Sequence, residues 1–129
     1  MTSSVISDNF ETSTGAIPTL GGDSVETRLC RAWVNFNGTG TVAIRASYNV
    51  SSITDNGTAD YTVNFTTAMS DTNYVMVGSS ADNNGGATST TVWSRSHAVA
   101  PTTTAQRIGT TGLNNVTYDT AWVYVTIFR

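Results

Sequence analysis

The chain has 129 residues and a formal net charge of −3, and only 12% of its residues are charged, roughly half the share of a typical soluble domain. Lysine is absent and glutamate occurs twice, whereas there are 24 threonines and 14 serines. This composition disfavours a largely helical protein, because Lys and Glu populate exposed helix faces and threonine is a weak helix former. The low, net acidic charge excludes an electrostatic nucleic-acid binder. The aromatic content of 9% disfavours disorder.

The length predicts one domain. No apolar run approaches the length of a membrane span, so membrane insertion is not expected. Residues 1–5 lack the features of a signal peptide, so we expect synthesis in a cytoplasm without export. The single cysteine, Cys30, has no partner for an internal disulfide and is expected to be a small, buried or half-buried apolar side chain.

Residues 1–30 differ from the rest of the chain. The stretch 3–14 is mostly polar, and 17–22 reads as an extended segment that ends in a Gly-Gly turn. Residues 23–29 offer the one plausible helical turn. The whole segment buries little on its own, so it predicts an N-terminal arm that docks on another protein or on another copy of the chain.

From residue 31 onward the pattern is that of β-strands separated by Gly- and Asn-rich turns. The Asn-Gly pairs at 37–38 and 56–57 are typical of tight turns. Stretch 41–48 alternates, with Val42, Ile44, Ala46 and Tyr48 expected on one apolar face. The predicted strands are 32–36, 41–48, a hairpin over 47–66, 73–79, 88–96, 106–111 and 121–128. They predict an all-β, compact antiparallel β-sandwich or jelly-roll-like domain over residues 31–129.

The last strand is apolar on both sides of its pleat. A strand of a small antiparallel sandwich normally exposes one side to water. Burial of both sides would require a covering arm or a contact with another subunit. We therefore expect a homo-oligomer, with an interface formed by Trp122, Tyr124, Ile127 and Phe128.

Few residues could carry catalysis. His97 is the one histidine, so a metal site with two histidines is excluded within one subunit, and the nearby serines lack the other members of a triad. Asp55, Asp60 and Asp82 lie beside Gly-containing turns, where aspartate commonly caps its own backbone. A calcium site at residues 82–85 would lack the distal glutamate of an EF-hand. We expect no enzyme activity, no cofactor and no metal.

Surface recognition remains as a functional class. Exposed aromatic side chains beside polar loops are a common way to bind sugars. The loops 81–88 and 97–104 are expected to face outward, and the candidate binding residues are Asn83, Asn84, Trp93, Arg95 and His97. The alternative is that Trp93 packs in the core or in an interface.

The sequence Trp-Val-Asn-Phe-Asn-Gly-Thr-Gly at 33–40 resembles a module of tailed bacteriophages, the C-terminal part of tail-fibre and other virion proteins, especially those of marine phages. The similarity extends over most of 31–80 and includes the terminal strand 123–128, whereas 81–120 departs from it. The resemblance implies a structural module without catalytic residues, which in that family typically forms homotrimers.

These features together predict a non-enzymatic bacteriophage structural protein located in the virion, as a tail fibre or as a component attached to the tail or head. Its expected partners are further copies of itself, other virion proteins through residues 1–30, and glycan on the host surface. The resemblance implies that the copies form a homotrimer. The alternatives are a soluble carbohydrate-binding module and a capsid decoration protein. A weaker third hypothesis is a polysaccharide depolymerase that uses Asp55, Asp60 or Asp82.

Overall fold

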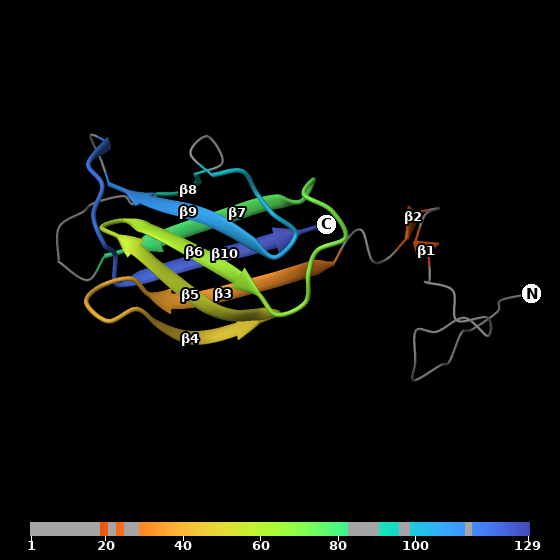
Figure 1. Ribbon diagram of the computed structural model, residues 1–129, viewed down its shortest axis with the longest axis horizontal. Helices are drawn as coiled ribbons and strands as arrows, with labels where there is room; N and C mark the ends of the chain where they lie inside the picture. The colour runs from red at the N-terminus through yellow and green to blue at the C-terminus, as the bar shows by residue number, and fades with distance from the viewer. Residues whose placement is uncertain (1–18, 21–22, 25–28, 83–90, 96–98, 113–114) are drawn as a thin grey trace, which may run out of the picture.

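The computed structural model describes residues 19–20, 23–24, 29–82, 91–95, 99–112 and 115–129. Two four-stranded antiparallel sheets pack as a β-sandwich, which confirms the predicted fold class (Figure 1). The strands of the sandwich are β3 (Cys30–Asn37), β4 (Ala43–Tyr48), β5 (Val50–Gly57), β6 (Asp60–Phe65), β7 (Val75–Ala81), β8 (Thr91–Ser94), β9 (Ala105–Thr111) and β10 (Trp122–Phe128). Two further strands of two residues each, β1 (Thr19–Leu20) and β2 (Asp23–Ser24), pair with each other.

One sheet has the order β4-β3-β10-β7 and the other the order β5-β6-β9-β8. The C-terminal strand β10 therefore lies in the middle of its sheet, between β3 and β7 (Figure 1). The expected hairpin over 47–66 is present as the antiparallel pair β5 and β6. Of the expected helical turn at 23–29, residues 23–24 form β2, and 25–28 lie outside the described residues, as do 1–18 of the expected arm.

The four residues expected on one apolar face of stretch 41–48 do not share a face, because the register shifts between Asn35 and Phe36. Ile44 lies opposite Phe36 of the core, whereas Tyr48 lies opposite the outward Trp33. Every residue of β4 is exposed. Strand β4 is an edge strand, and β5, the edge strand of the other sheet, is itself exposed along most of its length. Neither edge therefore covers the other. Val42, just before β4, still packs against the core.

Side chains that alternate along the strands fill the space between the sheets. In β3 and β10 every second residue points inward and is buried. The rings of Phe36 and Tyr61 meet edge to face, with their centroids 5.2 Å apart, at the geometry that aromatic pairs prefer. The core consists of Ala32, Val34, Phe36, Val50, Tyr61, Val63, Phe65, Met69, Val92, Ile108, Val123, Val125 and Ile127.

The buried hydroxyl of Tyr61 connects the core to two loops. It lies 2.8 Å from the carbonyl oxygen of Gly38 and 2.7 Å from Oδ1 of Asp119. The same carboxylate oxygen accepts a hydrogen bond of 2.7 Å from the backbone N–H of Ala59, which has a positive φ of 58°. A side chain at Gly38 would place its Cβ 2.7 Å from the Tyr61 oxygen, so glycine is required there for the close approach.

We predict that Tyr61→Phe lowers the free energy of unfolding by about 1–2 kcal/mol, because a buried hydrogen bond is lost and its acceptors remain. Tyr118→Phe is the matched control, since the Tyr118 hydroxyl oxygen is buried without a hydrogen-bond partner, and its removal should be neutral or stabilising. Urea unfolding of the two variants measures the difference. Equal destabilisation by both would contradict a role for the Tyr61 hydroxyl.

Candidate interaction surfaces

The outer face of the β4-β3-β10-β7 sheet carries a continuous set of large apolar side chains. Strand pairing places them in rows across the sheet: Tyr48–Trp33–Thr126–Val77, Ala46–Asn35–Tyr124–Ser79, Phe128–Val75 and Trp122–Ala81. The exposed large apolar residues of these rows, which define the aromatic face, are Trp33, Tyr48, Val75, Val77, Trp122, Tyr124 and Phe128. A contiguous apolar surface of this kind marks an interaction site on a soluble protein.

A β-bulge shapes one end of the aromatic face. The register between β3 and β4 shifts between Asn35 and Phe36, whose partners are Ala46 and Ile44, so Arg45 has no residue opposite. Bulges re-aim side chains, and the Arg45 guanidinium lies 3.8 Å from the centroid of the Trp122 ring. Trp122 and Tyr124 in turn stack with an interplanar angle of 13°. Cation–π contact and stacking thus order these side chains before any partner arrives.

Three of the four residues expected in an oligomer interface, Trp122, Tyr124 and Phe128, lie on the aromatic face. The structure places Ile127 elsewhere: it is 1% exposed and belongs to the core. Strand alternation explains this difference, because Ile127 points toward the other sheet, as Val123 and Val125 do. Ile127 is therefore removed from the set of residues available to a partner.

The prediction from β10 alone missed four members of the aromatic face: Trp33, Tyr48, Val75 and Val77. The apolar residues on both sides of stretch 73–79 were a usable signal, since a doubly apolar strand needs a second cover. The order of the strands was the missing information. It places β3, β4 and β7 around β10 and so brings the four residues beside the ones that were predicted.

The outer face of the β5-β6-β9-β8 sheet is polar by comparison. The carboxylate of Asp60 accepts two hydrogen bonds from Arg107, of 2.8 Å from Nε and 2.7 Å from Nη2. Arg95 forms an ion pair with the same carboxylate. Asn56 donates to the hydroxyl of Thr62 at 2.9 Å. We call this set of residues the polar cluster; its carboxylate is engaged by two guanidinium groups.

Trp93 and Arg95, both predicted as binding residues, lie together at this cluster. The Arg95 guanidinium is 5.0 Å from the centroid of the Trp93 ring. The ring also lies against Gly109, where an added Cβ would come within 2.7 Å of it. The indole N–H of Trp93 is buried and has no hydrogen-bond partner among the described residues. The Trp93 ring is thus packed against its neighbours, whereas a ring that binds a sugar leaves one face open for stacking. The other three predicted binding residues, Asn83, Asn84 and His97, lie outside the described residues.

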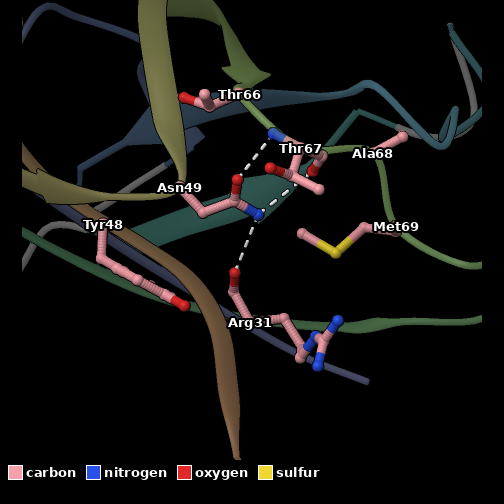
Figure 2. A pocket seen from close by; sticks show the side chains of 7 residues that line it. All are labelled: Arg31, Tyr48, Asn49, Thr66, Thr67, Ala68 and Met69. Atoms are coloured by element: carbon pink, nitrogen blue, oxygen red, sulfur yellow. Dashed lines mark hydrogen bonds between the residues drawn. The ribbon is translucent and has the colours of Figure 1, made fainter.

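A hollow of about 280 Å³ lies where β3, the β4–β5 corner and the segment after β6 meet. Figure 2 shows the Asn49 side chain at its centre, with hydrogen bonds to the backbone of Thr67 in both directions, 2.7 and 3.1 Å, and to the carbonyl oxygen of Arg31, 3.0 Å. Asn49 has a positive φ of 54°, which asparagine tolerates better than most residues. Its amide is thus used to hold the corner together. Tyr48 belongs both to the wall of this hollow and to the aromatic face.

Within the described part of the chain, no group of three or more His, Cys, Asp or Glu side chains is placed to hold a metal ion. Among the same residues, no helix is long and apolar enough to cross a membrane. Asp55 and Asp60, two of the carboxylates considered for glycoside hydrolysis, have structural partners: Asp55 accepts a hydrogen bond of 2.9 Å from the Gly57 N–H, and Asp60 accepts those of the polar cluster.

We predict that Asp60→Asn lowers the free energy of unfolding near pH 7 by about 1–3 kcal/mol, since a buried charged hydrogen bond is weakened. The hydrogen bonds from Arg107, opposed by desolvation and assisted by the charge of Arg95, hold the pKa of the Asp60 carboxyl below its ordinary value of 3.8. A lowered native pKa stabilises the fold fully above the unfolded value, and this contribution is lost as the pH falls through the native pKa.

The difference between the free energies of unfolding of the wild type and Asp60→Asn should therefore decrease as the pH falls below about 4. Asp55→Asn is the control, because its exposed side chain contributes to a turn, and its effect should stay within about 0.5 kcal/mol. A constant difference between wild type and Asp60→Asn down to acid pH would show that the substitution acts through something other than the charge of Asp60.

We predict further that Trp93→Ala lowers the free energy of unfolding by about 1–3 kcal/mol, less than a fully buried tryptophan, because the ring covers Gly109 and contacts Arg95. Thermal unfolding and retention on immobilised glycans should be measured together. A variant that melts like the wild type but no longer binds a glycan retained by the wild type would instead identify Trp93 as a sugar-stacking residue.

The chain was compared with protein-family models, with curated proteins and with solved structures, and none of the three comparisons gave a match. The surfaces described above are therefore the basis on which function is inferred.

Proposed function

We propose that this protein is a non-enzymatic structural component of a bacteriophage virion, part of a tail fibre or attached to the tail or head. In this proposal the sandwich is a rigid module that assembles with further copies of itself, as a homotrimer, and residues 1–30 bind other virion proteins. Host-surface glycan is contacted by the outward loops.

The aromatic face is the observation that carries the proposal. Its residues cover four strands of one sheet and remain exposed in the single chain. The largest apolar patch on a monomer is often functional, and exposed aromatic side chains spread over one face of a sheet favour a protein that works inside an assembly. A catalytic reading has less support, since the carboxylates Asp55 and Asp60 are engaged in a turn and in ion pairs.

The residues that resemble virion modules form one connected part of the sandwich. Stretch 31–69 covers β3 to β6, and 123–128 lies in β10, which pairs with β3 along its length. The motif at 33–40 contributes Trp33 to the aromatic face and Phe36 to the core. The resemblance thus involves both the interior of the module and the surface that we assign to assembly.

Purified particles of a phage whose genome encodes this chain provide the test. We expect mass spectrometry to find the chain in the particles and an antibody against it to label them at a fixed location. An electron-microscopy map then distinguishes a tail fibre from a capsid decoration protein, and we expect copies in multiples of three. Absence of the chain from particles that contain the other structural proteins would refute the proposal.

A further inference from the structure

We propose that the aromatic face is the surface through which one copy of this chain binds a second copy. This inference rests on the proposed assembly function and names its partner and its contact residues. The partner is identified from the size, the chemistry and the charge of the face.

The size of the face fits a stable protein interface. The four side chains Trp33, Trp122, Tyr124 and Phe128 are 37–39% exposed, Tyr48 is 58% exposed, and Val75 and Val77 are 61% and 57% exposed. With roughly 150–250 Å² for a whole aromatic side chain, the exposed apolar area is on the order of 500 Å². A standard interface buries about 800 Å² on each partner, of which about 60% is apolar. The exposed apolar area of the aromatic face therefore agrees with the apolar area that one partner buries in a standard interface.

The chemistry of the face favours a protein partner over a glycan. A sugar needs hydrogen-bonding groups around the ring on which it stacks. Here the hydroxyls of Tyr48 and Thr126 are the hydrogen-bonding groups directly across the sheet from Trp33, and the row continues to the apolar Val77. At the adjacent end of the sheet Phe128 pairs with Val75. Trp122 is already in contact with Arg45 and Tyr124. Contact of such a surface with a protein partner is favourable in free energy, because it removes apolar groups from water.

The charge of the face favours a second copy over a different protein. The seven residues that define the aromatic face are uncharged, and the guanidinium of the adjacent Arg45 is placed on the Trp122 ring. A face without an extended charge pattern offers little to select a charged partner and does not repel its own copy. Interfaces between identical subunits are also more apolar than those between transient partners. A flat sheet face can stack on another sheet at the usual spacing of about 10 Å.

Light scattering of the full-length chain after gel filtration, over a range of concentrations, tests the inference. We expect the wild type to be an oligomer. Val77→Glu on β7 and Tyr48→Glu on β4 each place a charge at opposite edges of the aromatic face and should weaken self-association by about 100-fold or more. Thr91→Glu is the matched control, because Thr91 is an exposed β-branched residue on β8, the edge strand of the other sheet, and this variant should remain an oligomer.

Thermal unfolding followed by circular dichroism shows whether each variant is folded. Each of the two aromatic-face variants tests the inference separately, so one folded variant is sufficient for the test. A wild type that is monomeric at all concentrations would overturn the inference. This holds also if the tryptophans of the monomer are protected from a fluorescence quencher, because the aromatic face would then be covered by another part of the same chain. Oligomers that persist in both Val77→Glu and Tyr48→Glu, or that also dissociate in Thr91→Glu, would overturn it as well. A dimer would support the inference and contradict the expected homotrimer, whereas the chain's absence from particles would contradict the virion function alone.

Discussion

The position of β10 between β3 and β7 is the constraint on which the rest of the structure depends. Because successive residues of a strand point to opposite sides, this placement sends Val123, Val125 and Ile127 into the core and Trp122 and Tyr124 to the outside. The inward residues are required for the packing of the two sheets. The outward ones remain exposed in the single chain, and the proposed contact with a second copy would account for their apolar character.

The two outer faces of the sandwich have different chemistry for this reason. On the β5-β6-β9-β8 sheet, several outward polar side chains pair with one another: Asp60 accepts from Arg107, and Asn56 donates to Thr62. Threonine suits such positions, because it is β-branched and can still hydrogen-bond. On the other sheet the outward positions hold aromatic and valine side chains whose exposed area is hydrated. The small number of charged residues is therefore divided between two kinds of surface, a polar cluster in which one carboxylate pairs with two guanidinium groups and an apolar face.

The fold class and the strand positions could be predicted from the sequence, because alternation and Asn-Gly turns are local signals. The doubly apolar β10 was also a local signal, and it led to Trp122, Tyr124 and Phe128. Three things could not be predicted, since they depend on which strands become neighbours. Ile127 was assigned to an interface although it lies in the core. The apolar residues of 41–48 were expected on one face although a bulge divides them. Finally, Trp33, Tyr48, Val75 and Val77 were not connected to β10. The partners of Asp60 were equally non-local, because Arg107 is 47 positions away in the chain.

Two copies could also associate by pairing the edge strands of this sheet. At β4 the structure makes such edge pairing less favourable. An unpaired edge strand offers backbone groups to any other strand. On β4 the bulge at Arg45 interrupts the regular ladder, and a bulge hinders the addition of another strand. Growth of the sheet by edge pairing would also leave the aromatic rings in water. Contact between faces removes them from water, so the bulge of β4 and the outward rings of β10 agree with the proposed contact between faces.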